Sequence, residues 1–177
     1  MIEALISSKT RIKLLLKFFL NSNTISYLRG LEQEFGESSN AIRIELNRFE
    51  QAGLLTSFTE GNKKWFKANN THPLFLEIHN ILLKHLGLDQ LIQSITERLG
   101  SIQKVYLTGT FSRGLDGPII DLILIGEINT TFLIQLIERV ENMIHRKVRY
   151  IIFTSEESLL PNWEAFKPEP LLLWSHE

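Results

Sequence analysis

Three successive helix patterns followed by two strand-like runs, all within residues 8–68, constrain the fold of this chain more than any other feature. Apolar residues recur at helical spacing in residues 8–21, and Ser8 is suited to cap this first helix. Ser26 is expected to cap a second helix that ends at Gly36, because glycine readily adopts the left-handed backbone of a helix terminus. Short amphipathic helices bury their apolar faces against one another, so we expect them to share one small core.

The third helix pattern leads directly into a predicted β-hairpin. This helix opens at residues 37–40 and ends at Gly53. Strand-like runs over residues 54–59 and 64–68 follow, and residues 60–63 join them. The glycine and asparagine in this connection favour a tight turn because both tolerate positive φ. Three helices and a hairpin, with a short turn between the second and third helices, form the plan of a winged helix-turn-helix.

This plan leaves one face of the third helix free to enter the major groove of DNA, which is about 12 Å wide. The side chains predicted to contact DNA are Ser39, Asn40, Arg43, Asn47 and Arg48 on the helix and Asn62, Lys63 and Lys64 at the hairpin tip. Residues 1–70 contain ten Lys and Arg against seven Glu, so their net charge is +3 within a chain whose net charge is −1. A basic half favours a polyanionic partner. Two alternatives stay open. The winged helix could bind a protein in place of DNA, or the lysines at the hairpin tip could simply form a solvated strand edge that blocks pairing with other strands.

The sequence AIRIELNRFEQAGLLTSFTEGNKKWFKANNTHPLF resembles winged-helix bacterial transcriptional regulators, in particular the arsenical-repressor-like group. The resemblance covers roughly the first 73 residues and lies in the order of helix end, wing turn and aromatic wing strand. The resemblance implies that the protein binds double-stranded DNA. A single winged helix reads few base pairs, so the resemblance also implies a homodimer on a two-fold site.

Two further helices are expected between the hairpin and the rest of the chain. Residues 74–87 form the first, with Leu82 and Leu86 predicted in or near a dimer interface, and residues 89–99 form the second. His79 and His85 are six residues apart and so do not share a helix face, which argues against a metal pair.

From Lys104 onward the pattern changes to an alternation of strands and helices. An apolar strand precedes Gly109, and a second strand begins at Asp121. A helix over residues 131–145 and a third strand over residues 147–154 follow. This order is typical of α/β domains that handle mononucleotides.

The segment VYLTGTFSRGLDGPIIDLILIGE resembles the signature of the minimal nucleotidyltransferase superfamily. In that family a Gly-Ser turn cradles phosphates, and three carboxylates hold two metal ions. The residues that the resemblance assigns to nucleotide or anion binding are Gly109, Thr110, Arg113, Gly114 and Asp121. Of the three carboxylate positions, Asp121 fills one, Ile119 stands at another and the third falls near Arg149. The resemblance therefore implies a degenerate site, unless Asp116 or Glu127 substitutes.

The sequence thus predicts an α+β protein with an N-terminal winged helix-turn-helix (residues 1–73), linking helices (74–100) and a C-terminal α/β nucleotidyltransferase-like domain (101–177). The function expected is a DNA-binding transcriptional regulator that is not an enzyme, whose second domain serves as sensor or assembly module. An active nucleotidyltransferase and an antitoxin-like protein-binding module are the alternatives. We expect no resident cofactor or metal and a nucleotide or anion as effector. The absence of cysteine favours a reducing, cytoplasmic location, and the charged N-terminal apolar run is too short for a membrane span.

Overall fold

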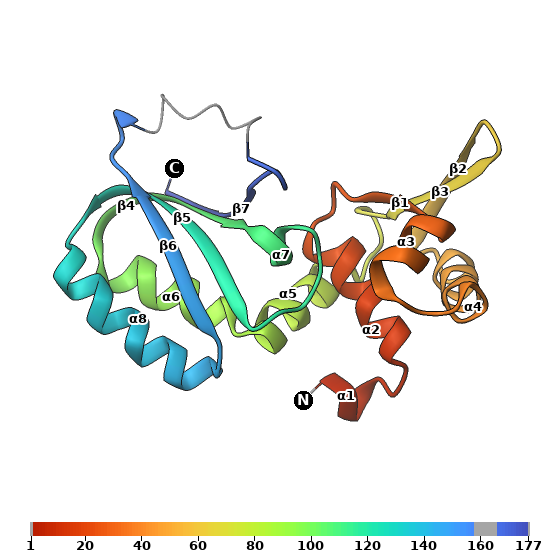
Figure 1. Ribbon diagram of the computed structural model, residues 1–177, viewed down its shortest axis with the longest axis horizontal. Helices are drawn as coiled ribbons and strands as arrows, with labels where there is room; N and C mark the ends of the chain where they lie inside the picture. Colours follow the sequence, from red (N-terminus) through yellow and green to blue (C-terminus); the bar gives the residue numbers. More distant parts are fainter. Residues whose placement is uncertain (1, 158–165, 177) are drawn as a thin grey trace. The chain divides into compact units, whose positions relative to one another are not determined.

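The computed structural model describes residues 2–157 and 166–176, and the chain divides into two compact units, residues 1–85 and residues 86–177 (Figure 1). The division falls inside the stretch that was expected to link two domains. The fold is mixed, with helices and strands in both units. Among the described residues, no helix is long and apolar enough to cross a membrane.

The first unit contains helices α1 (Ile2–Leu5), α2 (Lys9–Leu15), α3 (Leu28–Phe35) and α4 (Ser39–Gln51), and α2 continues as the π-helical segment η1 (Leu16–Leu20). Ser8 caps α2, as expected, because its hydroxyl accepts a hydrogen bond from the backbone N–H of Arg11. Ser38 caps α4 in the same way. Gly36 ends α3 with a φ of 64°, which confirms the predicted left-handed helix terminus.

A small antiparallel sheet completes the first unit. It consists of β1 (Ile25–Tyr27), β2 (Leu55–Glu60) and β3 (Lys63–Ala68), in the order β1-β3-β2. The hairpin of β2 and β3 confirms the predicted strands, and Gly61 at its tip has a φ of 61°. The prediction that Ser26 caps the second helix is wrong. Ser26 lies in β1 opposite Phe66 of β3, and α3 begins after Tyr27 without a side-chain cap.

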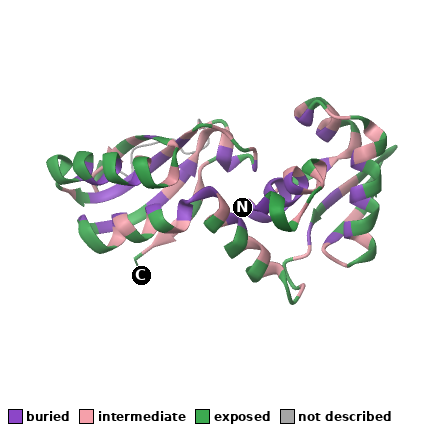
Figure 2. Cartoon of the chain, turned by 90° about the horizontal axis from the view of Figure 1, so that it is seen from below, coloured by how far each residue is buried: buried purple, intermediate pink, exposed green. Residues whose placement is uncertain are grey.

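The core of the first unit lies where its helices face one another and the sheet. Figure 2 shows the buried residues of each unit in its interior and the outward faces of the helices exposed. The apolar residues that form the predicted stripes of the first and third helices are all buried: Ile12, Leu15, Leu16, Phe19, Leu20, Ile42, Leu46 and Phe49. The 3.6-residue periodicity therefore identified the inner face of α4 correctly, whereas all five residues of η1 are buried, Lys17 and Phe18 included.

Helix α5 (Phe75–Leu86) follows the sheet and confirms the helix predicted over residues 74–87. Its first turns pack on the first unit, since the rings of Phe75 and Phe19 are 5.6 Å apart and His79 Nδ1 lies 2.7 Å from the carbonyl oxygen of Phe19. Leu82 and Leu86, predicted near a dimer interface, are fully buried within one chain. They therefore offer no surface to a second copy.

The second unit is a four-stranded sheet with two long helices. Its elements are α6 (Leu88–Arg98), β4 (Gly100–Thr108), α7 (Gly109–Ser112), β5 (Ile119–Ile128), α8 (Thr130–Ile144), β6 (Lys147–Phe153) and β7 (Leu171–Ser175). The sheet order is β6-β5-β4-β7, in which only β5 and β6 run parallel. The strands expected around Gly109 and Asp121 and over residues 147–154 are confirmed, and the C-terminal apolar segment pairs with β4.

Helices α6 and α8 cover one face of this sheet (Figure 1). Along β6, Val148 is buried whereas Lys147, Arg149 and Ile151 are exposed. Side chains alternate between the two faces of a strand, so this pattern indicates that the face opposite the helices is more open. Asp121 of β5 pairs with Arg149 of β6 and with Thr108 of β4. These three side chains consequently lie side by side across three strands.

Candidate functional site

A concave groove runs between α4 and the β2–β3 hairpin in the first unit. Its cavity volume is about 440 Å³, and its lining comprises Tyr27, Leu28, Arg29, Arg43, Leu46, Asn47, Asn62, Lys63, Lys64 and Phe66. The floor is apolar, since Leu46 and Phe66 are buried. The rim carries arginine, lysine and asparagine side chains that are exposed. We call this feature the α4–hairpin groove.

Five of the eight residues predicted to contact DNA line the α4–hairpin groove: Arg43, Asn47, Asn62, Lys63 and Lys64. The other three do not line it. The hydroxyl of Ser39 donates to Glu32, Arg48 forms an ion pair with Glu45 at 3.2 Å, and Asn40 is exposed in the first turn of α4. The fold thus brings helix and hairpin candidates, 15 or more residues apart in sequence, into one surface.

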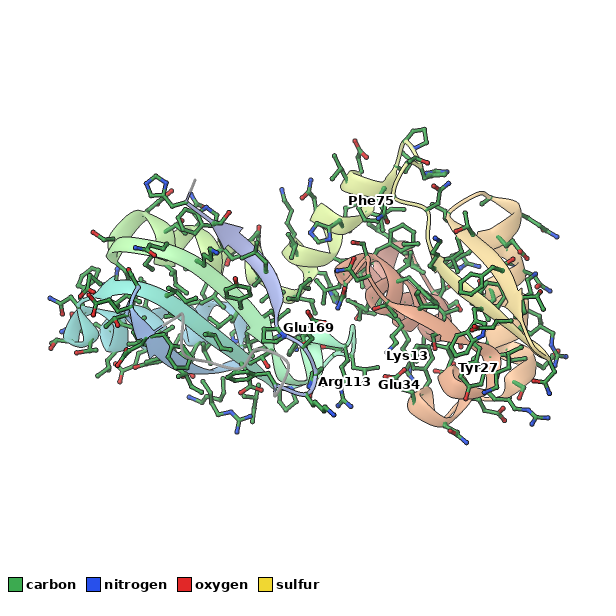
Figure 3. All side chains as sticks on the ribbon, turned by 90° about the horizontal axis from the view of Figure 1, so that it is seen from above. Lys13, Tyr27, Glu34, Phe75, Arg113 and Glu169 are labelled. Atoms are coloured by element: carbon green, nitrogen blue, oxygen red, sulfur yellow. The ribbon has the colours of Figure 1, made fainter. Side chains whose placement is uncertain are left out.

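Sequence reasoning missed Tyr27 and Arg29 as groove residues. Tyr27 ends β1 and lies beside the hairpin (Figure 3), with its ring 4.7 Å from the ring of Trp65. The Nζ atom of Lys63 lies 4.5 Å from the centre of the Tyr27 ring, within the range of a cation–π contact. Gly30 permits this packing, because a Cβ there would lie 3.1 Å from Tyr27 Cε1. The sequence did contain a signal for these two groove residues, since Tyr27 and Arg29 lie close together and are followed by Gly30.

The charged side chains that line the α4–hairpin groove are all positive. Its lining contains four cationic side chains, those of Arg29, Arg43, Lys63 and Lys64, and no carboxylate. Within the described ranges, Lys64 is the only one of the four that is paired, with Glu50 at 2.7 Å, and neither arginine has a carboxylate within 4.0 Å. Hydrogen bonds from Lys64 and Ser57 hold the pKa of Glu50 below its ordinary value. The groove therefore presents excess positive charge to an incoming ligand.

A buried carboxylate fixes α4, which carries one wall of the groove, against α2. Glu45 has a side chain only 7% exposed. It accepts hydrogen bonds from Arg11 Nε at 2.9 Å, from Arg11 Nη2 at 3.2 Å and from the hydroxyl of Ser8 at 3.1 Å. Burial raises the pKa of Glu45, but the hydrogen bonds and the charges of Arg11 and Arg48 outweigh burial and leave the pKa below its ordinary value.

A second cavity, of about 470 Å³, lies on the more open face of the sheet in the second unit. Its lining comprises Thr108, Gly109, Asp121, Leu122, Arg149, Tyr150, Ile151, Phe166, Lys167 and Pro168. Of the five residues predicted to bind a nucleotide or anion, Gly109 and Asp121 line this cavity. Thr110, Arg113 and Gly114 do not, and Arg113 is exposed at the end of α7 (Figure 3). We call this feature the β5–β6 cavity.

Asp121 is held from two sides in the β5–β6 cavity. The Nε atom of Arg149 donates to Asp121 Oδ1 at 2.7 Å. This hydrogen bond, together with the charge of Asp121, raises the pKa of the arginine further above its ordinary value. Gly109 packs against the other oxygen, because a Cβ at Gly109 would overlap Asp121 Oδ2, and its φ of +69° is one that side chains rarely adopt. The sequence resemblance placed a third carboxylate near residue 149. The structure has a guanidinium there, that of Arg149, in contact with Asp121.

Asp116 and Glu127, the two carboxylates that are near Asp121 in sequence, do not line the β5–β6 cavity. Asp116 is paired with Arg146 at 2.6 Å, and Glu127 lies near the opposite end of β5, paired in register with Ser101. Ile119, an apolar residue, starts β5 opposite Lys147. Within residues 2–157 and 166–176, no three His, Asp, Glu or Cys side chains are grouped so that they could hold a metal ion.

Comparisons with known proteins give only weak similarities. No protein-family profile matches the sequence, and no curated protein matches it. A protein from Archaeoglobus fulgidus has a similar structure at 15% identity and a TM-score of 0.36, over 55% of this chain and 94% of that chain. A candidate nucleotidyltransferase from Sulfolobus solfataricus is 20% identical with a TM-score of 0.37, over 57% of this chain and 86% of that chain.

A candidate transcriptional regulator for arsenical resistance is 21% identical to this chain, with a TM-score of 0.31, over 53% of this chain and 90% of that chain. Each of these three similarities spans little more than half of the chain. The comparisons therefore do not assign the chain to a family. Its function has to be argued from its own residues.

Proposed function

We propose that this protein is a DNA-binding transcriptional regulator whose first unit is a winged helix-turn-helix. The observation that carries the proposal is the α4–hairpin groove, whose lining has four cationic side chains and no carboxylate. A DNA backbone carries one negative charge per phosphate, and neutralising those charges releases counterions, which dominates affinity. A groove of this charge, bounded by a helix and a hairpin, suits the backbone of a duplex.

In the proposed complex, α4 enters the major groove. Arg43 and Asn47 are four residues apart and so lie on the same exposed face of the helix. Arginine reads guanine through two hydrogen bonds and asparagine reads adenine in the same way, so these two side chains supply base contacts. Lys63 and Lys64 at the hairpin tip contact phosphates. The ring of Tyr27 holds the Lys63 ammonium in place beside them.

The second unit is proposed to be a sensor or assembly module that does not transfer nucleotides. Two-metal catalysis needs several carboxylates about one pair of metal ions. Asp121 is already ion-paired with Arg149, and Ile119 offers no oxygen ligand. A guanidinium at this distance repels the divalent cations that the reaction requires. These contacts support a site that has lost metal-dependent chemistry.

The functional form is proposed to be a homodimer that binds a two-fold operator, because one winged helix contacts too few base pairs for specific recognition. Leu74 and Ile81 support a contact through the α5 region, since their relative exposures are 54% and 44%. Ile81 lies in α5, and Leu74 immediately precedes the first residue of that helix. The buried Leu82 and Leu86 have no part in this contact.

The test is a binding selection on random duplex DNA with the purified full chain. The wild-type protein is expected to enrich one sequence, and Arg43→Gln or Asn47→Ala is expected to change or lose that preference. Lys9→Gln is the matched control, because Lys9 is exposed on α2 and does not line the groove. Recovery of no enriched sequence, or enrichment that is identical in all four proteins, would contradict the proposal.

A further inference from the structure

We infer that the β5–β6 cavity of the second unit is an oxyanion site, which binds a phosphate or carboxylate carried on an apolar or aromatic group without a divalent metal. Arg149 and Lys167 are its cationic ligands. Both line the cavity, and both are exposed. The inference rests on the sensor role proposed for the second unit, for which it names the ligand class, and does not depend on DNA binding by the first.

Arg149 is oriented for a ligand by the contact that it already makes. A guanidinium has five N–H donors, and the Nε donor is engaged with Asp121 Oδ1 at 2.7 Å. Within the described part of the chain, the two terminal nitrogens of Arg149 make no hydrogen bond, and its side chain is 69% exposed. An arginine fixed through one edge can offer its other edge to two oxygens of an anion. The position of this edge is set before the ligand arrives, which lowers the entropic cost of binding.

Asp121 does not cancel the positive charge of the cavity. Its carboxylate is fixed between the Arg149 guanidinium and the backbone of Gly109. Lys167 adds a second positive charge, and it has no carboxylate within 4.0 Å among the described residues. One negative and two positive groups line the cavity, so its net charge is positive and favours an anionic ligand. A divalent cation would instead meet two like charges.

The remaining lining defines what the anion is attached to. Phe166, Pro168 and Ile151 give the cavity an apolar and aromatic wall, and Thr108 contributes a hydroxyl. Sites for small molecules typically combine such walls with a few polar groups that fix orientation. A cavity of about 470 Å³ accommodates a ring as well as an oxyanion. The ligand class is therefore an aryl or similar apolar phosphate or carboxylate.

The experiment is a calorimetric titration of the full chain, without DNA and in the presence of EDTA, with phenyl phosphate, benzoate, inorganic phosphate and phenol. Phenyl phosphate and benzoate are expected to bind saturably. Inorganic phosphate is expected to bind more weakly and phenol not measurably, because the oxyanion supplies the polar contacts. Arg149→Gln and Lys167→Gln are each expected to weaken phenyl phosphate binding roughly tenfold, the size of one charge-assisted hydrogen bond.

Asp121→Asn separates an oxyanion site from a metal-dependent one. Removing the negative charge is expected to tighten phenyl phosphate binding several-fold, whereas a metal site would lose binding. Arg139→Gln on α8 is the matched control, since Arg139 is exposed and does not line the cavity. Lys167→Gln breaks no ion pair of the described structure, so it stays informative if the Arg149 variant folds poorly.

Three results would each overturn the inference. The first is absence of phenyl phosphate binding by the wild-type chain. The second is binding that requires magnesium or disappears in Asp121→Asn. The third is binding that is unchanged in both Arg149→Gln and Lys167→Gln. None of these results bears on the proposed DNA groove, so failure of this inference and failure of the DNA-binding proposal are distinguishable.

Discussion

Replacing Glu45 by glutamine tests whether the ion-pair network behind α4 fixes this helix against α2. The Glu45 side chain is 7% exposed, and it accepts hydrogen bonds from Arg11, Ser8 and Arg48. Glutamine is nearly isosteric but neutral, so Glu45→Gln leaves two arginines without their counter-charge. The change alters charge while it keeps the packing of the buried position.

The expected loss of unfolding free energy is about 1–2 kcal/mol near pH 7. Truncating one partner of a fully buried ion pair costs about 3–5 kcal/mol. Here Arg11 and Arg48 are 35% and 59% exposed, so water replaces part of what they lose and reduces the effect. Glutamine also keeps one acceptor oxygen, which retains a neutral hydrogen bond worth about 1 kcal/mol.

The effect of Glu45→Gln has a defined dependence on pH. The pKa of Glu45 is below its ordinary value in the folded protein, so ionised Glu45 stabilises the fold. This contribution is fully present above the unfolded pKa of about 4.3 and is lost as the pH falls through the lower folded pKa. The difference between wild type and variant should therefore be largest near neutrality and disappear in strong acid.

Urea unfolding followed by far-ultraviolet circular dichroism, repeated across the acid range, measures this difference. Glu60→Gln is the matched control, because Glu60 is exposed in the same unit, and we expect it to change stability by less than about 0.5 kcal/mol. The reasoning would be refuted by a variant as stable as wild type near neutrality. A difference that persists undiminished in strong acid would refute it equally.

Three further predictions concern the second unit and the assembly. Gly109→Ala should lower thermal stability, by about 1–3 kcal/mol in unfolding free energy, because the added Cβ overlaps Asp121 Oδ2 at a backbone φ of +69°; an unchanged melting temperature would contradict this. Labelled nucleoside triphosphates with magnesium or manganese and cell extract should transfer no label, and labelling that is abolished in Asp121→Ala would show an active enzyme. Ile81→Asp should convert a dimer into a monomer in analytical ultracentrifugation, and a wild-type protein that is already monomeric would argue against the proposed dimer.

Much of the first unit was predictable because its signals are local. Helix α4 has Ile42, Leu46 and Phe49 at helical spacing, and each of them is buried. The hairpin carries a glycine and an asparagine in its turn. Each of these patterns lies within a few residues and reflects backbone preferences that do not need tertiary contacts.

The features that sequence reasoning missed depend on contacts between distant residues. Strand β1 has three residues and exists through pairing with β3, about 40 residues later, so Ser26 was read as a helix cap. Because Ser26 was assigned to a helix start, Tyr27 was not predicted to line the α4–hairpin groove. The Asp121–Arg149 ion pair spans 28 residues and depends on the exact register of two parallel strands, which a sequence pattern does not fix. Lys167 could be assigned to a cavity only from the fold.

The salt dependence of DNA binding tests the central proposal most directly. If Arg29, Lys63 and Lys64 each neutralise one phosphate while Arg43 contacts a base, the logarithm of the association constant should fall with the logarithm of salt concentration with a slope of about −2.7. The double substitution Lys63→Gln and Lys64→Gln should reduce that slope to about −0.9, while Lys9→Gln should leave it unchanged. Failure to bind any duplex, binding insensitive to salt, or a slope unaltered in the double variant would contradict a DNA interface in the α4–hairpin groove.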